Sequence, residues 1–523
     1  MSFPLLTAAA ALPAVGAVLT AAVPAARRTT AKWLALAFSL GTFVLAALVV
    51  VRFEPGGDRY QLTESHAWIP DFGVRYELGV DGIAVALIAL TALLIPFIIL
   101  AGWHDADPLE TKSSRWRPTQ GFFALILMVE AMVILSFEAT DVFLFYIFFE
   151  AMLIPMYFLI GGFGDRAHAG TDGAAATQRS YAAVKFLLYN LVGGLIMLAA
   201  VIGLYVVAGS FSLAEIAEAR ANGSLEMATN TERLLFLGFF FAFAVKAPLW
   251  PLHTWLPNAM GEATTPVAVL ITAVVDKVGT FAMLRFCLQL FPEASKWATP
   301  VIIVLALISI IYGALLAVGQ RDIKRLIAYA SISHFGFIVL GIFAMTSQGQ
   351  SGATLYMVNH GISTAALMLV AGFLITRRGS RLIVDYGGVQ KVAPVLAGTF
   401  LIGSLATLSL PGLAPFVSEF LVLVGVFAAY PVAGIIATLG IVLGALYSLV
   451  LYQRTMTGPV VAEVKAMPDL KIRELVVVAP LIALLLLLGV YPKPLTEIVN
   501  PAVKHTMSDV QKKDPKPEVE AAK

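Results

Sequence analysis

The residue that most strongly suggests chemistry in this chain is a lysine inside an apolar segment. Lys246 is the only charged residue of the run 234–252, and Pro248 interrupts the predicted helix two residues later. A lysine at the centre of a membrane helix costs roughly 2.5 to 3.5 kcal/mol, and a proline at that depth frees backbone groups that lipid cannot bond. Both features indicate a position that faces protein or water, which is typical of an ion path.

Other ionisable side chains also fall within apolar segments. They are Glu130, Glu150, Lys185, Asp276, Lys277, His334, His360 and Glu419. Carboxyl, ammonium and imidazole groups can each hold and release a proton when burial and neighbouring charges tune their pKa. A buried lysine beside a carboxylate is especially suitable, because moving or neutralising the carboxylate changes the proton affinity of the lysine. The pattern therefore indicates proton transfer through a membrane.

Structural explanations remain open for several of these residues. Glu150 and Lys246 could form a salt bridge that only holds two helices together. Lys185 could extend to the membrane interface, and Asp276 could serve only as the partner of a neighbouring cation. His360 could be a hydrogen-bonded core histidine.

The composition places these residues in a polytopic membrane protein. Of 523 residues, 59% are hydrophobic and 13% are charged, whereas soluble domains carry about 25% charged residues. The net charge of +2 provides no basic field that would attract nucleic acid. Cys287 is the single cysteine, which excludes an internal disulfide and a cysteine-ligated cluster, and we find no nucleotide-binding glycine motif. We therefore expect no cofactor and no metal in this chain.

Apolar segments near 20 residues long predict an all-α fold with about fourteen transmembrane helices. The predicted spans are 4–25, 31–52, 80–101, 121–138, 141–162, 181–208, 234–258, 266–291, 300–319, 323–346, 352–376, 395–429, 431–456 and 474–491. Prolines break the seventh span at Pro248, Pro251 and Pro257 and the twelfth at Pro411 and Pro415. Because five spans separate the two breaks, we expect two inverted five-helix repeats, which are typical of ion-coupled transporters.

The predicted spans and repeats divide the chain into five parts. They are helices 1–3 (1–120), a first repeat of helices 4–8 (121–291), a second repeat of helices 9–13 (300–456), helix 14 with a following segment (474–503), and a disordered tail (504–523).

The loop charges predict the orientation. Lysine and arginine collect in the loops after odd-numbered spans: Arg27, Arg28, Lys32, Lys112, Arg115, Arg117, Arg166, Arg179, Arg321, Lys324, Arg325, Arg377, Arg378, Arg381, Lys391, Arg454, Lys465, Lys471 and Arg473. Cytoplasmic loops carry this excess, so we expect both termini on the outer side.

Several sequence motifs resemble a known family. They are KAPLWPLHTWLPNAM (246–260), QRDIKRLIAYASISHFGFIVLG (320–341), LPGLAPFVSEF (410–420) and the segment DVFLFYIFFEAMLIPMYFLIG around Glu150. Together they look like the antiporter-like subunits of the bacterial proton-pumping NADH:quinone oxidoreductase, respiratory complex I, over most of the chain. Among the three such subunits the chain resembles the M type, because Glu419 stands where the L and N types usually place a lysine.

The resemblance implies roles for individual residues. Glu150 and Lys246 would form the charge pair of a first half-channel, and Lys277 and His334 a central connection. His360 would be a further relay and Glu419 the terminal site of the second half. Glu130 matches a glutamate of helix 4 in the M type. Asp276 departs from the pattern, since an apolar residue is expected before the lysine of helix 8.

The resemblance also implies partners and a location. NADH, FMN, iron–sulfur clusters and quinone would be bound by partner subunits, and the sister subunits L and N and the lipid bilayer would surround this chain in the bacterial cell membrane. Two alternatives remain open: a subunit of a multisubunit Mrp-type sodium/proton antiporter, and a structural membrane spacer.

Overall fold

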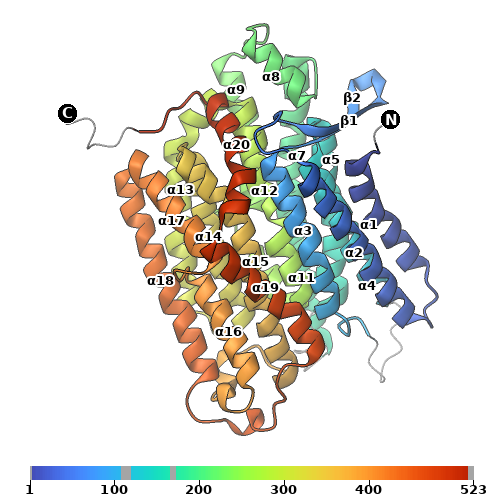
Figure 1. Ribbon diagram of the computed structural model, residues 1–523, viewed down its shortest axis with the longest axis vertical. Helices are drawn as coiled ribbons and strands as arrows, with labels where there is room; N and C mark the ends of the chain where they lie inside the picture. Colours follow the sequence, from blue (N-terminus) through green and yellow to red (C-terminus); the bar gives the residue numbers. More distant parts are fainter. Residues whose placement is uncertain (1–2, 108–118, 165–171, 516–523) are drawn as a thin grey trace. The chain divides into compact units, whose positions relative to one another are not determined.

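Helices make up most of the computed structural model, which describes residues 3–107, 119–164 and 172–515 (Figure 1). Two units with dense internal packing divide the chain. Unit 1 comprises Met1–Lys246 and Glu262–Ala294, and unit 2 comprises Ala247–Gly261 and Ser295–Lys523. The boundary therefore falls directly after Lys246, where the seventh predicted span is interrupted.

Unit 1 begins with long apolar helices and a hairpin. Its elements are α1 (Leu5–Ala22), α2 (Arg28–Arg52), β1 (Gln61–Ile69), β2 (Val74–Val80), α3 (Gly82–Ala101), α4 (Thr119–Glu138), α5 (Val142–Ala151), α6 (Leu153–Phe163), α7 (Asp172–Ala208), α8 (Leu213–Ala221), α9 (Thr229–Lys246), α11 (Thr265–Val269), η2 (Leu270–Val275), α12 (Lys277–Ala282) and η3 (Met283–Leu288). Aspartates start two of the helices: the carboxylate of Asp81 accepts from the amide of Ala84, and that of Asp141 accepts from Leu144, both at 2.8 Å.

Unit 2 is built almost entirely of helices. They are α10 (Leu256–Glu262, whose last residue belongs to unit 1), α13 (Pro292–Val318, from Ser295 on), α14 (Ile323–Phe343), α15 (Ser347–Arg378), α16 (Pro394–Thr407), α17 (Ala414–Ala429), α18 (Pro431–Met456), α19 (Ile472–Val490) and α20 (Lys493–Asp509). Asp322 and Thr346 cap α14 and α15, and Gly379, at φ +72°, ends α15 in the left-handed conformation.

The chain is a polytopic membrane protein of the all-α class, as predicted. Twelve helices in the described part of the chain are long and apolar enough to cross a membrane, or thirteen if a bent pair counts as one span. Our prediction of about fourteen also counted the two interrupted segments, α9 with α10 and α16 with α17. The seventh span does break after Lys246, and the twelfth breaks between Thr407 and Ala414.

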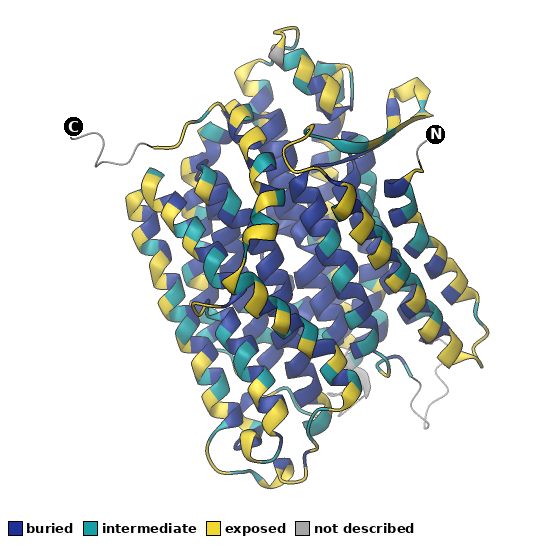
Figure 2. Ribbon diagram, in the orientation of Figure 1, coloured by how far each residue is buried: buried dark blue, intermediate teal, exposed yellow. Residues whose placement is uncertain are grey.

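Burial separates the helices into two kinds (Figure 2). The segment Thr265–Leu288 in unit 1 and α15 in unit 2 are buried along their whole apolar window. By contrast, less than half of the apolar window is buried in α1, α2, α7, α18 and α19, which carry large apolar side chains at the surface. Such faces suit lipid or neighbouring membrane proteins. The buried helices carry ionisable residues, so the protein surrounds those charges with its own groups.

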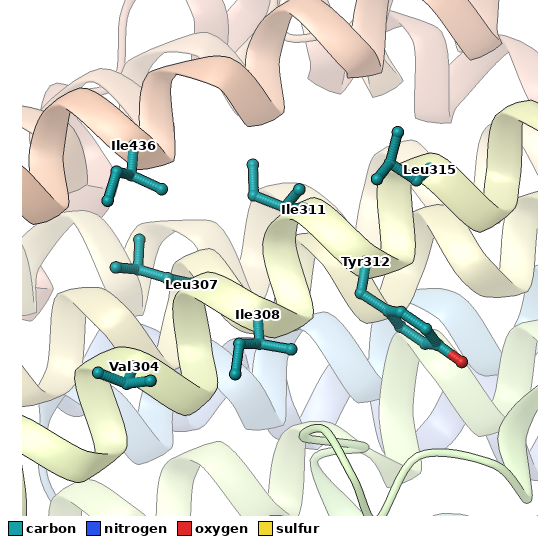
Figure 3. Close-up of a pocket in the computed structure, with 7 residues that line it drawn as sticks. All are labelled: Val304, Leu307, Ile308, Ile311, Tyr312, Leu315 and Ile436. Carbon is teal, nitrogen blue, oxygen red and sulfur yellow. The ribbon is translucent and has the colours of Figure 1, made fainter.

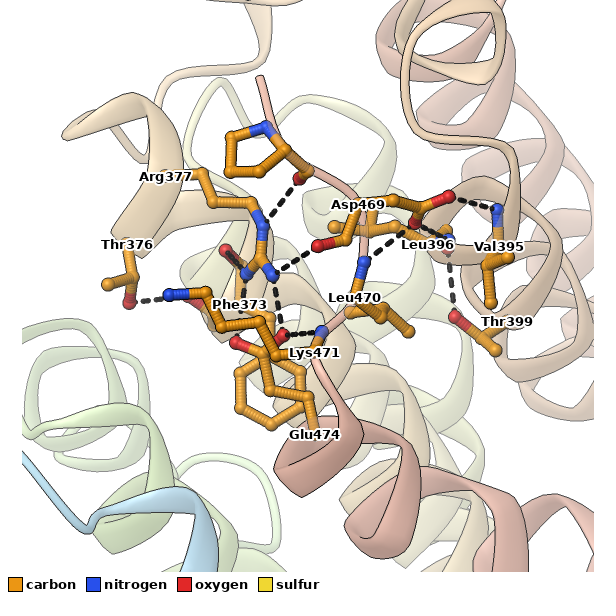
Figure 4. A network of polar contacts seen from close by, with 12 residues as sticks. Phe373, Thr376, Arg377, Val395, Leu396, Thr399, Asp469, Leu470, Lys471 and Glu474 are labelled. Carbon is orange, nitrogen blue, oxygen red and sulfur yellow. Dashed lines mark hydrogen bonds and ion pairs between the residues drawn. The ribbon is translucent and has the colours of Figure 1, made fainter.

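A polar network ties the ends of three helices together in unit 2 (Figure 4). The guanidinium of Arg377, in the last turn of α15, pairs with the Glu474 carboxylate, with Nη2 and Oε2 2.5 Å apart. Arg377 also donates to the backbone carbonyls of Pro468 and Asp469, and the Asp469 carboxylate accepts from the first amides of α16. The network satisfies helix-end groups that would otherwise be left unpaired.

Several local features differ from the prediction. An antiparallel hairpin, β1–β2, connects α2 to α3. The fifth span is interrupted at Met152, two residues after Glu150, and the eighth contains the two π-helical segments η2 and η3. Lys504 to Asp509 are helical within α20, so the expected disordered tail does not begin at residue 504.

Some residues used in the prediction lie outside the described part of the chain. They are Lys112, Arg115, Arg117 and Arg166 of the loop-charge pattern and residues 516–523 of the tail.

Candidate functional site

In unit 1, Lys246 at the end of α9 and Glu150 near the end of α5 interact electrostatically. Lys246 is the last residue of α9 and is 1% exposed. Its Nζ donates to the carbonyl of Phe149 at 2.7 Å and lies 3.7 Å from the centre of that residue's ring. The charges of Glu150 and Lys246 act on each other, and Glu150 Oε1 has no hydrogen-bond partner among the described residues. The carboxylate is thus near the lysine yet not locked to it.

A glycine on α7 makes room for this carboxylate. A Cβ added at Gly194 would overlap the carboxylate of Glu150. Gly194 was not predicted as a site residue, since glycine is frequent in membrane helices.

Lys277 and Asp276 stand where the eighth span leaves regular α-helical geometry. The π-helical segment η2 ends at Val275, and Lys277 Nζ donates to the carbonyl of Thr272, five residues back, at 3.0 Å. π-helical turns within α-helices are frequent at functional sites, because they expose carbonyls to side chains. Asp276 is fully buried, and neither of its carboxylate oxygens has a hydrogen-bond partner in the described ranges. Its charge acts on both Lys277 and Lys246, so it is electrostatically shared by the two lysines.

Glu130 lies in the middle of α4 and is 0% exposed. Both oxygens of its carboxyl group lack a hydrogen-bond partner within the described residues. The structure therefore places a buried titratable group on α4, as the sequence predicted, without a direct contact to the lysines.

In unit 2 the two predicted histidines join a cluster with two tyrosines. His334 Nδ1 is 2.6 Å from the hydroxyl of Tyr356, and its Nε2 is 3.3 Å from the hydroxyl of Tyr447. The rings of His334 and His360 lie 5.3 Å apart between centroids. Tyr356 precedes His360 by one helical turn on α15, a spacing that places both on one face and could have drawn attention to the tyrosine.

Glu419 on α17 faces the same cluster. It is 3% exposed, and its charge acts on the hydroxyls of Tyr356 and Tyr447. Ser409, at φ +58° in the break before α17, also faces Glu419 and Tyr356, although its hydroxyl forms no hydrogen bond of regular geometry among the described residues. The break thus brings a hydroxyl beside the carboxyl group. His334, His360 and Glu419 therefore belong to one polar cluster within unit 2.

Among the described residues, no three His, Cys, Asp or Glu side chains are grouped so that they could hold a metal ion. A groove of about 450 Å³ on α13 is lined by apolar residues, with Tyr312 as the polar exception (Figure 3). None of the predicted site residues lines it, so the groove is separate from the buried charges.

Glu138 is a buried acid that was not predicted from the sequence as a site residue. This residue ends α4, where the predicted span also ended, and such a position normally lies at the membrane surface. The structure buries it completely, with both carboxylate oxygens unpartnered by any described residue.

Comparison with known proteins identifies the family. Residues 139–444 match the family model described as "NADH:quinone oxidoreductase/Mrp antiporter, TM". A Mycobacterium tuberculosis protein named NADH-quinone oxidoreductase subunit M is 56% identical over 97% of this chain and 95% of its own length. A chain in the structure of respiratory complex I from Thermus thermophilus is 31% identical, with a TM-score of 0.84 over 97% of this chain and 99% of that one.

A chain of the Mrp complex from Dietzia sp. DQ12-45-1b has the same fold, with a TM-score of 0.81 over 98% of this chain and 100% of that one, at 21% identity. The family model and the relative named subunit M confirm the resemblance inferred from the motifs. The chain belongs to the family of antiporter-like membrane subunits shared by NADH:quinone oxidoreductases and Mrp antiporters, and within it to the subunit M type.

Proposed function

We propose that this chain carries protons across the membrane as an antiporter-like subunit of NADH:quinone oxidoreductase, with quinone reduction taking place in other subunits. The observation that carries the proposal is Lys246, a lysine 1% exposed at the interrupted end of a membrane helix, whose charge is shared between Glu150 and Asp276. Such a cation is costly in a membrane and is retained where charge must move.

The predicted site residues take the following roles in this proposal. Glu150 and Lys246 exchange protons in unit 1, with Glu130 as a further buried acid on α4. Lys277 passes protons toward unit 2, where His334 and His360 receive them and Glu419 is the terminal group. Hydroxyl groups of Tyr356 and Tyr447 link His334 to Glu419, since each lies within hydrogen-bond distance of the His334 ring and interacts electrostatically with the Glu419 carboxylate.

The remaining assignments follow from the family. The sister subunits L and N are the neighbours we propose in the membrane, and the exposed apolar faces of α1, α2 and α18 suit such contacts or lipid. NADH, FMN, iron–sulfur clusters and quinone are assigned to partner subunits. We place the chain in the bacterial inner membrane with both termini outside, from the loop charges.

An Mrp-type sodium/proton antiporter subunit is the second candidate, because the fold is shared with the Mrp chain. Purification of this chain with its natural partners separates the two. We expect the purified assembly to oxidise NADH and reduce quinone, and to contain chains of the L and N types. An assembly that exchanges sodium for protons without oxidising NADH would contradict the proposal.

A further inference from the structure

Glu138 is a buried carboxylate that the path described above does not use. It is the last residue of α4 and is 0% exposed, and neither oxygen has a hydrogen-bond partner in the described part of the chain. The nearby cation Arg285 is engaged elsewhere: Nη1 donates to the carbonyls of Phe137 and Ala139 at 2.9 and 3.3 Å, and Nη2 lies 3.1 Å from Asp81 Oδ1. A buried, unpaired carboxylate costs stability, so its presence indicates a function.

The β1–β2 hairpin offers Glu138 a route to other proton-exchanging groups. Burial raises the pKa of the Tyr76 hydroxyl, and the charges of Glu138 and Glu64 raise it further. The hydroxyls of Tyr76 and Thr7 are 3.0 Å apart, and the Thr7 hydroxyl hydrogen-bonds the Glu64 carboxylate. These contacts form a continuous polar chain from Glu64 through Thr7 to Tyr76. Glu138 lies beside this chain, since the next residue, Ala139, pairs with Leu78, two residues after Tyr76 on β2.

Exposure increases along this chain toward the hairpin surface. Glu138 is fully buried, Tyr76 and Glu64 are half-buried, and the neighbouring strand residues Ser65 and Arg75 are exposed. Arg75 Nε donates to the Ser65 hydroxyl at 3.1 Å on that surface. The hairpin thus leads from a buried acid to solvent within unit 1.

We propose that Glu138 is the inner group of a proton path that opens to water at the β1–β2 hairpin. The inference rests on the proposed proton-carrying function and adds an opening to water within unit 1. In each passage one O–H bond forms on the Glu138 carboxylate and one breaks when the proton moves on through the Tyr76 and Thr7 hydroxyls toward Glu64, so no electron changes hands. Glu130, eight residues earlier on α4, lies roughly 12 Å further along the helix, a distance that water would have to bridge.

The test uses the whole assembled complex with four variants. Glu138→Gln keeps the shape and removes the titration, Glu138→Asp keeps a carboxyl group, and Glu218→Gln is a matched control on an exposed residue of α8. Lys246→Ala reports on the proposed function itself. Proton uptake per NADH oxidised is measured in inverted vesicles, together with the thermal stability of the purified complex.

We expect Glu138→Gln to assemble, to be at least as heat-stable as the parent, and to lose proton uptake by about tenfold or more, since a positioned proton-transfer group contributes about 10²–10⁴ in rate. Glu138→Asp should restore part of the uptake. Uptake in Glu138→Gln equal to that of Glu218→Gln overturns the inference, as does a destabilised variant that Glu138→Asp does not rescue. If Lys246→Ala alone loses uptake, only this inference fails; if neither variant loses it, the proposed function fails as well.

Discussion

At the scale of single residues, the charges of Lys246, Glu419 and Glu150 differ in how their own helices affect them. Lys246 ends α9, where exposed carbonyls favour a cation, and Glu419 lies six residues into α17, toward the end that favours an anion. Glu150, in contrast, lies in the last turn of α5, where the helix dipole disfavours an anion. Glu150 therefore depends on Lys246 for its charge, whereas Glu419 does not lie at a helix C-terminus. This difference makes Glu150 the acid more sensitive to a change in its partner.

A substitution series at Glu419 tests its assigned role. Moving a proton against 100 mV costs about 2.3 kcal/mol, so a terminal group must change its proton affinity by more than about one pK unit between states. Glu419→Gln cannot titrate, and we expect it to lose most proton uptake into inverted vesicles. Glu419→Lys can titrate and should retain part of it, reduced by the dipole of α17.

Glu497→Gln provides the control for this series, because that side chain is 60% exposed on α20. Both the control and the parent should pump alike. Full pumping in Glu419→Gln, normalised to assembled complex, would show that Glu419 is not on the path.

At the scale of elements, the helix breaks and close packing position the charges. In a helix that ran unbroken past Met152 or Lys246, the backbone carbonyls would accept hydrogen bonds from amides of the same helix. The breaks leave such groups available, and the π-helical segment before Lys277 does the same for the carbonyl of Thr272. Packing is equally specific, since the Glu150 carboxylate occupies the space that a Cβ would take at Gly194 on α7.

A pair of glycine substitutions tests this packing. In Gly194→Ala the new methyl group would overlap the Glu150 carboxylate, the flexible end of a side chain that can move away. We expect an assembled complex with reduced proton uptake, because Glu150 is displaced from Lys246. Gly162→Ala is the matched control, since no atom lies within 4 Å of its added Cβ.

Both substitutions carry the same gain in helix propensity, about 1 kcal/mol, so that effect cancels between them. Equal uptake in the two variants would mean that the position of Glu150 against Gly194 has no bearing on function.

The sequence predicted those features that depend on the type of residue at a position. Pro248, Pro411 and Pro415 revealed two breaks, and charges within apolar runs revealed Lys246 and Glu419. The break at Met152 and the π-helical turns depend on tertiary packing, which overrides local propensity. They could therefore not be predicted from the residue types alone.

Glu138 was missed because its burial depends on tertiary structure. It comes last in an apolar run, and the hairpin elements near it were not predicted. The tail prediction was wrong for Lys504–Asp509 because α20 is an amphipathic helix of low mean hydropathy whose apolar face is buried, with Val503 and Met507 among its buried residues.

At the scale of the whole molecule, the loop charges predict the orientation in the membrane. Arg377, Arg378 and Arg381 lie at and just after the end of α15, in a loop that we expect to be cytoplasmic. A reporter inserted beside them should therefore behave as cytoplasmic, and one fused after Lys523 as external. Finding both reporters on one side would contradict the count of spans and the inverted repeats that depend on it.

The family indicates a membrane complex, and the proposed mechanism depends on the buried charges within each unit. Unit 1 holds Glu150, Lys246, Asp276 and Lys277, and unit 2 holds His334, His360 and Glu419. A structural spacer would retain such groups only as stabilising pairs. The carboxylates of Glu130, Glu138 and Asp276, however, lack hydrogen-bond partners among the described residues. In a purely structural subunit, such groups would only lower the stability of the fold.

The most direct test of proton carriage is proton uptake per NADH oxidised in inverted vesicles that contain Lys246→Ala, normalised to assembled complex. Lys493→Ala is the control, because that lysine is 63% exposed. We expect Lys246→Ala to assemble and to lose most proton uptake, as Glu150→Gln should, while the control pumps like the parent. Proton uptake in Lys246→Ala equal to that of Lys493→Ala would contradict the account and support a purely structural role for the buried charges.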